Sequence, residues 1–225
     1  MIKNIIFDLG NVIVDIDISR TFDSLEQLLG AAHINKLGDH FFHQYEKGMM
    51  STQEFLSQLG SESSDISEHQ IVEAWNAMLL KIPAHRLEML KSLRNRYRIF
   101  AMSNINDLHL NWILSELNQN HNITAFEKIY FERAYYSHIE QFRKPEEAFY
   151  KHVLQSASLI PHETLFIDDN FDNICAASSV GIIAHHHDYV HEDVVDIIES
   201  LIHKNKKLTE CETPSEQLFD TIEIK

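Results

Sequence analysis

The sequence predicts an α/β fold with a parallel-sheet core and a helical segment inserted after its first strand. Strand-like and helix-like segments alternate over residues 85–203, which is typical of βαβ units and a parallel sheet. Residues 18–84 instead carry apolar residues at helical spacing, which indicates a helical insertion. Polar residues follow several expected strands, where open α/β sheets bind their ligands.

Composition and charge exclude several classes of function. The 225 residues include 44% hydrophobic and 24% charged residues, enough for a large core with an insertion. A net charge of −15 argues against nucleic-acid and anionic-membrane partners. No apolar run reaches about 18 residues, and the beginning of the sequence lacks the features of a secretory signal. The two cysteines have no metal-ligand spacing. We expect a cytoplasmic protein with a small-molecule substrate, and no feature indicates an oligomeric state.

The first expected strand leads directly to a carboxylate. The apolar residues Ile5, Ile6 and Phe7 are followed by Asp8 and then by a turn that contains Gly10. An Asp at the carboxyl end of a strand lies where a substrate or metal arrives. The alternative is an Asp that only caps the turn.

The inserted segment carries its own helix signals. Residues 51–54, Ser-Thr-Gln-Glu, have the form of a capping box, and Gly60 is a plausible C-terminal stop for the same helix. We therefore expect several short helices between residues 18 and 84.

The remaining elements follow in order. Pro83 marks the start of a helix over residues 86–97, and a buried strand over 98–102 follows it. We expect further strands at 128–131, 164–167 and 182–184, and further helices at 108–117, 145–157 and 173–180. A terminal helix would expose Glu192, Asp193 and Asp196, and the polar tail 204–225 would be weakly ordered.

Carboxylates at two strand ends suggest a metal site. Asp8 and the pair Asp168–Asp169 would meet at one edge of a parallel sheet. Their oxygens are of the kind that Mg²⁺ prefers. Asp8 could also act as a nucleophile and form an aspartyl-phosphate.

Polar residues at two further boundaries suggest phosphate binding. Ser103 and Asn104 follow a strand and could donate hydrogen bonds to phosphate oxygens, although a helix N-cap is an equally simple role for them. Lys144, before Pro145, could neutralise charge on a transferring phosphoryl group. Taken alone, a solvated lysine is the commoner case.

Three histidines at residues 185–187 invite a metal interpretation. They are consecutive, so they cannot all face one way along a strand, and no carboxylate lies at ligand spacing. We expect them to form a loop at the end of a strand.

Together these motifs resemble the haloacid dehalogenase (HAD) superfamily of phosphatases. The matching segments are Phe7–Val12, Met102–Asn104, Arg143–Pro145 and Phe166–Asn170, with Asn173. The resemblance implies a Rossmann-like catalytic core of residues 1–17 and 85–203 and a helical C1-type cap of residues 18–84. Within the superfamily, the core is similar to the bacterial α-D-glucose-1-phosphate phosphatases, and the cap much less so.

The resemblance also implies roles for individual residues. Asp8 would attack phosphorus, and Lys144 would bridge Asp8 and the phosphate. Mg²⁺ would be held by Asp8, the Gly10 carbonyl and Asp169, with Asp168 close by or bound through water. Ser103 and the amide of Asn104 would hold the phosphoryl oxygens.

Gly10 departs from the pattern of many relatives, which carry a second Asp there as acid and base. Asp15, Asp17, His43, Glu46 or solvent could move the proton instead. We predict a Mg²⁺-dependent phosphatase acting on a small phosphorylated metabolite such as glucose 1-phosphate. The alternatives are a dehalogenase or phosphomutase, or a binding or regulatory module without turnover.

Overall fold

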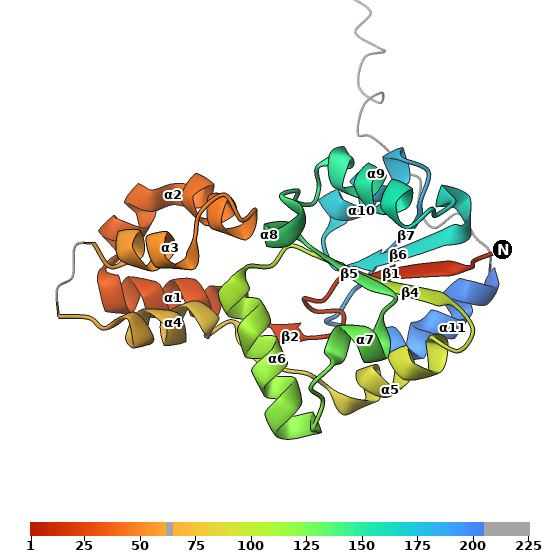
Figure 1. Ribbon diagram of the computed structural model, residues 1–225, viewed down its shortest axis with the longest axis horizontal. Helices are drawn as coiled ribbons and strands as arrows, with labels where there is room; N and C mark the ends of the chain where they lie inside the picture. Colours follow the sequence, from red (N-terminus) through yellow and green to blue (C-terminus); the bar gives the residue numbers. More distant parts are fainter. Residues whose placement is uncertain (62–64, 205–225) are drawn as a thin grey trace, which may run out of the picture.

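A five-stranded parallel sheet forms the centre of the computed structural model, which describes residues 1–61 and 65–204 (Figure 1). Its strand order is β5–β4–β1–β6–β7, so the first strand lies in the middle. The strands are β1 (Asn4–Phe7), β4 (Arg98–Ser103), β5 (Arg133–Tyr136), β6 (Thr164–Asp168) and β7 (Ile183–His186). The predicted α/β class is therefore confirmed.

Helices cover both faces of this sheet. Alternate side chains of β1 point to opposite faces, so Ile5 and Phe7 belong to one hydrophobic cluster and Ile6 to another. The first cluster packs under α5 (Ala84–Leu93), α6 (Asp107–His121), α7 (Phe126–Tyr130) and α11 (Val194–Lys204). The second packs under α9 (Glu147–Ser156) and α10 (Phe171–Ser179). The turn α8 (Ser137–Glu140) and the 3₁₀ turn η1 (Pro161–Glu163) complete the core.

The inserted segment forms four helices beside the sheet (Figure 1). They are α1 (Ile18–Leu29), α2 (Ala31–Glu46), α3 (Thr52–Leu59) and α4 (Glu68–Asn76). Their apolar faces pack together in a third cluster, centred on aromatic rings such as Phe42, Phe55 and Trp75. The capping box predicted for α3 is present, with Ser51 and Glu54 bonded reciprocally and Gly60 at the end of the helix.

Two short strands connect the insertion to the sheet. β2 (Asp15–Ile16) and β3 (Leu79–Lys81) pair antiparallel, with Ile16 opposite Leu79. The chain therefore enters and leaves the insertion through one hydrogen-bonded ribbon.

One predicted strand is wrong. Residues 128–131 lie mostly in helix α7, and the strand follows as β5. Phe126 and Tyr130 are both buried and lie four residues apart, a helical spacing that the short apolar run concealed.

The C-terminal part of the chain differs in detail from the expectation. Glu192 and Asp193 precede α11 rather than lying on it, and Asp193 accepts hydrogen bonds from Arg86. Beyond residue 204, the predicted tail lies outside the described residues. Among the helices that are described, none has the length and apolar character to span a membrane.

Candidate active site

Asp8 follows β1 at the carboxyl edge of the sheet, beside the end of β6. Its backbone N–H donates to the Ile167 carbonyl at 2.9 Å, which continues the β1–β6 pairing of Phe7 with Ile167. Asp8 as a whole residue is only 8% exposed. The parallel register thus brings Asp8 next to Asp168 although 160 residues separate them, as expected for strand ends that share one edge.

Lys144 connects these two carboxylates. Its Nζ lies 2.8 Å from Asp8 Oδ1 and 2.6 Å from Asp168 Oδ2, and the residue is 2% exposed. A buried ammonium group needs such partners because unpaired burial of a charge is costly.

The Asn104 side chain holds the backbone of Lys144. Its amide Nδ2 donates to the Lys144 carbonyl at 2.9 Å, and its Oδ1 accepts from the Lys144 N–H at 2.8 Å. This side chain therefore fixes the position of the Lys144 backbone. Sequence reasoning had assigned Asn104 to phosphate binding and missed this contact.

Asp168 and Asp169 are oriented by asparagines. Asn173 Nδ2 donates to both oxygens of Asp168 at 2.9 and 3.0 Å, and the Asn170 N–H donates to Oδ1 at 2.8 Å. Asn11, which has a left-handed φ of 53°, donates to Asp169 Oδ2 at 2.9 Å. Asn11 was also missed, and its position just after Gly10 in the first motif is the signal that could have found it.

The cluster carries more negative than positive charge. Burial raises the pKa of Asp8 to about 7; Asp168 and Asp169 add to the rise and Lys144 opposes it. Burial also raises the pKa of Asp169. Burial lowers the pKa of Lys144, but Asp168 and Asp8 outweigh this effect and its pKa is raised. These shifts have the physical cause expected for three carboxylates that share one ammonium group.

The donor set fits a hard divalent cation. One oxygen each of Asp8, Asp168 and Asp169 lies within 4.8 Å of the others. All are carboxylate oxygens, the ligands that Mg²⁺ prefers. A divalent cation at this point would compensate the excess negative charge.

Gly10 and Ser103 lie at the same edge of the sheet, after β1 and at the end of β4. Gly10 forms an isolated bridge with Val14. A Cβ atom at Gly10 would meet Ile16 Cδ1 at 2.9 Å and Asp8 Oδ2 at 3.8 Å. Ser103 ends β4 at 4% exposure, and its hydroxyl has no hydrogen-bond partner among the described residues.

Three of the proposed substitutes for the acid are engaged elsewhere. Asp15 accepts from Arg86 at 2.8 Å, and Asp17 caps α1 through Ser19. Glu46 pairs with Arg143 Nε at 3.0 Å. Their carboxylate oxygens already accept hydrogen bonds from other groups.

Comparison with known proteins identifies the family. The model of the haloacid dehalogenase-like hydrolases matches residues 2–181, which is most of the chain and includes every motif described above. The chain belongs to this family. It is therefore a hydrolase with the fold of the haloacid dehalogenase-like enzymes.

Named relatives include two phosphatases. A D-ribitol-5-phosphate phosphatase of Bacteroides thetaiotaomicron is 29% identical over 187 residues, covering 80% of this chain and 89% of its own. A sesquiterpene phosphatase of Aspergillus oryzae is 30% identical over 189 residues, covering 82% and 89%. Neither is a glucose-1-phosphate phosphatase, so the finer resemblance drawn from the sequence stays a prediction.

A solved structure adds a ligand-bound relative. It is a HAD family enzyme from Bacteroides thetaiotaomicron in complex with magnesium and inorganic phosphate, 32% identical to this chain. The superposition has a TM-score of 0.77 and covers 86% of this chain and 97% of the relative.

Proposed function

We propose that this chain is a Mg²⁺-dependent phosphatase for a small phosphorylated metabolite, a polyol or sugar phosphate. The observation that carries the proposal is the buried Lys144, bound between Asp8 and Asp168 with Asp169 alongside. The phosphatase relatives and the relative crystallised with magnesium and phosphate support the same chemistry.

In this proposal Asp8 is the nucleophile. Its carboxylate attacks phosphorus, the ester P–O bond breaks, and the leaving alkoxide takes a proton. Water then attacks the aspartyl-phosphate, the Asp8 O–P bond breaks, and inorganic phosphate leaves with the carboxylate restored. Splitting one displacement into two is the usual benefit of covalent catalysis.

Lys144 has two roles in the proposal. Its ammonium group holds one oxygen of Asp8 and so fixes the orientation of the nucleophile. It also stabilises negative charge on the phosphoryl group, as preorganised cations do in a dry site. The hydroxyl of Ser103, which is unpaired among the described residues, would donate to a phosphoryl oxygen together with the Asn104 N–H.

Asp8, Asp169 and the Gly10 carbonyl would hold Mg²⁺, with Asp168 nearby. The bound ion would neutralise phosphate charge and raise the electrophilicity of phosphorus. Because Gly10 carries no acid, the proton for the leaving group would come from solvent.

Residues 18–84 would act as a cap that selects the substrate. Their helices pack around a hydrophobic cluster of their own, and the end of α2 contacts the Lys144 loop through Glu46–Arg143 and Lys47–Glu146. D-ribitol 5-phosphate and glucose 1-phosphate are the first two substrates to test, the former from a relative and the latter from the resemblance of the core.

A phosphate-release assay tests the proposal. Purified protein with Mg²⁺ is incubated with a panel of polyol, sugar and isoprenoid phosphates, and inorganic phosphate is measured. We expect release from at least one polyol or sugar phosphate, and its loss on addition of EDTA.

Variants distinguish loss of the proposed active site from nonspecific effects of a substitution. Asp8→Asn is expected to lower turnover at least about 1000-fold because the amide is a poor nucleophile. Asp172→Asn is the control, since Asp172 is an exposed carboxylate in the first turn of α10. Equal activity of Asp8→Asn and the control would disprove the role of Asp8, and no release from any substrate would disprove the phosphatase.

A further inference from the structure

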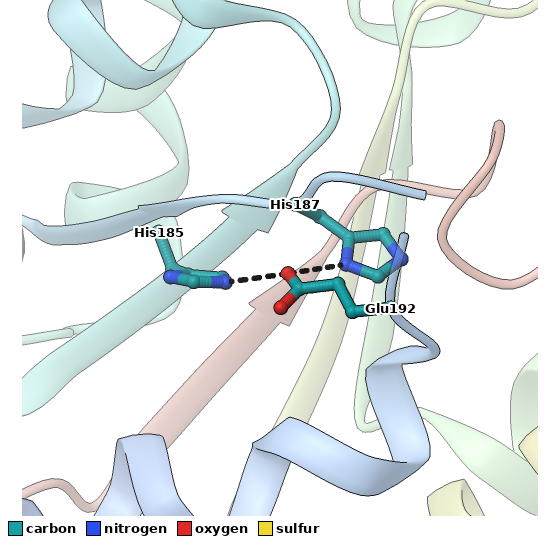
Figure 2. Close-up of side chains that lie close together, drawn as sticks. All are labelled: His185, His187 and Glu192. Carbon is teal, nitrogen blue, oxygen red and sulfur yellow. Dashed lines mark hydrogen bonds and ion pairs between the residues drawn. The ribbon is translucent and has the colours of Figure 1, made fainter. Parts of the chain in front are cut away.

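A second group of metal-binding side chains lies beyond β7. His185 and His187 are two residues apart and point to one side of the strand end, where they flank the carboxylate of Glu192 (Figure 2). Two expectations from the sequence are wrong here. His185 and His186 belong to β7 rather than to a loop, and the chain turns back after β7 to bring a carboxylate between His185 and His187. The three histidines do not all face one way, as expected, because His186 contacts the Asp169 carbonyl instead.

This group is separate from the carboxylate cluster at Asp8. His185 pairs in register with Ile167, whose side chain lies in the hydrophobic cluster under α5 and α11. Asp168 pairs instead with His186. Because neighbouring residues of a strand face opposite sides of the sheet, His185 and Asp168 lie on opposite faces.

The distances suit a tetrahedral ion. Glu192 Oε1 lies 3.2 Å from His185 Nε2 and 3.2 Å from His187 Nδ1. Ligands about 2.0–2.2 Å from a tetrahedral ion are about 3.3–3.6 Å apart. The two imidazole nitrogens lie within 4.8 Å of each other.

A single hydrogen bond holds the His187 ring among the described residues. Its side chain is fully buried, Nδ1 faces Glu192, and Nε2 on the other side of the ring has no partner there. Glu192 Oε1 is approached by both rings and also by the Asp188 N–H at 3.3 Å. An ion bound to His187 Nδ1 would hold the ring far more strongly than this neutral hydrogen bond.

We propose that His185, His187 and Glu192 form a binding site for Zn²⁺ or a similar first-row transition ion. Two imidazoles and one carboxylate are the donors that such ions prefer, whereas Mg²⁺ prefers oxygen ligands alone. Three protein ligands leave one position for water. Side-chain exposures of 18% for His185 and 29% for Glu192 give the ion access from solvent.

The ion would strengthen the attachment of this loop to the carboxylate edge. The His187 N–H donates to the Asp168 carbonyl at 2.9 Å, and His186 Nε2–H donates to the Asp169 carbonyl at 2.9 Å. The loop therefore supports the backbone of both acidic residues. Binding to the folded protein alone would raise its stability in proportion to the logarithm of the ion concentration.

Zinc binding to the metal-free protein tests the proposal. Zn²⁺ affinity is measured by competition with a chromogenic chelator in saturating Mg²⁺, which occupies the carboxylate cluster, and stoichiometry by elemental analysis after dialysis. We expect one tightly bound Zn²⁺ per chain, with affinity reduced at least tenfold in His185→Gln and in Glu192→Gln. His191→Gln is the matched control because His191 lies on the same loop, but its side chain is 78% exposed and, among the described residues, pairs with Asp188 alone. Its affinity should stay within twofold of the wild type.

A crystallographic measurement guards against variants that fail to fold. Wild-type crystals soaked in Zn²⁺ should give an anomalous peak between His185, His187 and Glu192. Undiminished binding in both folded variants, no Zn²⁺ retained by the wild type, or a peak only elsewhere would overturn the proposal. None of these measurements depends on phosphatase activity, so they succeed or fail independently of the proposed function.

Discussion

At the scale of single residues, Gly10 has different consequences for metal binding and for proton transfer in the proposed mechanism. A glycine can offer its carbonyl to an ion but cannot protonate an alkoxide. The position has space for a side chain, because the only close atom to an added Cβ is the flexible end of Ile16 at 2.9 Å. The glycine is therefore not required by packing.

Gly10→Asp tests whether the lack of a general acid at this position limits turnover. We expect turnover of alkyl phosphates such as ribitol 5-phosphate to rise about tenfold or more, since a general acid contributes typically 10²–10⁴-fold. Anomeric phosphates, with better leaving groups, should gain less. Steady-state kinetics of both substrates provide the measurement. Asn is about the size of Asp but carries no acidic proton. An equal gain in turnover in Gly10→Asn would therefore contradict the explanation.

Asn104 offers a second test at this scale, because its side chain holds the Lys144 backbone in two hydrogen bonds. Asn104→Ala should lower kcat about tenfold, which corresponds to 1.4 kcal/mol, roughly the net value of one or two hydrogen bonds. Asn104→Asp keeps the acceptor for the Lys144 N–H. Its kcat should therefore fall less than that of Asn104→Ala if this hydrogen bond makes the larger contribution. Unchanged kcat in Asn104→Ala would show that Lys144 is held adequately without it.

At the scale of elements, the end of α2 is packed closely against the turn α8. Gly48 has a φ of 66°, and a Cβ there would lie 2.0 Å from the His138 carbonyl oxygen. Ser137, also in α8, donates to the Glu46 carbonyl at 2.6 Å. Glycine at this position thus permits backbone-to-backbone contact between the insertion and the core.

Gly48→Ala should displace this contact. Gly38 provides a matched control because its φ is 67° but a Cβ there meets nothing within 4 Å. Gly38→Ala should cost about 1–3 kcal/mol from its backbone conformation alone, because φ 67° with ψ 171° is adopted almost only by glycine. Gly48→Ala should cost at least about 2 kcal/mol more from the clash. Urea unfolding measures both. Equal losses of stability in the two variants would mean that the segment around Gly48 moves away from His138 without cost.

At the scale of the whole molecule, a buried network joins the insertion to the core. His109 of α6 stacks on Trp75 of α4 at 4.9 Å and donates from Nε2 to the Trp75 carbonyl at 3.1 Å. Asn106 accepts from the Trp75 indole N–H and donates to His109 Nδ1. Burial lowers the pKa of His109 to about 4.

The contribution of His109 to stability should therefore fall on acidification. Between pH 6.5 and about 4 the unfolded chain binds a proton at His109 that the folded protein does not, so the His109 contribution to the free energy of unfolding decreases as pH falls through this range. This contribution is about 3 kcal/mol, at 1.4 kcal/mol per pKa unit. Asp8, whose pKa is raised, acts in the opposite direction in both proteins, so the measurement is the difference between them: the wild type should lose stability relative to His109→Gln as pH falls. Parallel curves for the two proteins would rule out His109 as the cause.

Much of this arrangement could be predicted from sequence, because parallel strands share an edge. Asp8, Lys144, Asp168 and Asp169 were identified by their places after strands or before helices, and β6 ends on Asp168 as expected. Contacts that depend on side-chain direction could not be predicted. Asn104 turns toward the Lys144 backbone, and Glu192 returns to His185 through a loop that has no periodic pattern. The error at residues 128–131 has a similar origin, since a short apolar run suits either a helix or a strand.

The ribbon of β2 and β3 determines where the length of this chain could change. Paired strands lie about 4.8 Å apart, so the two ends of the insertion are neighbours, as in a hairpin. A two- or three-residue turn could join Ile16 to Leu79 and leave the sheet continuous. The length of the inserted segment can therefore change without separating β2 from β3, and Asp8 and Lys144 lie outside that segment.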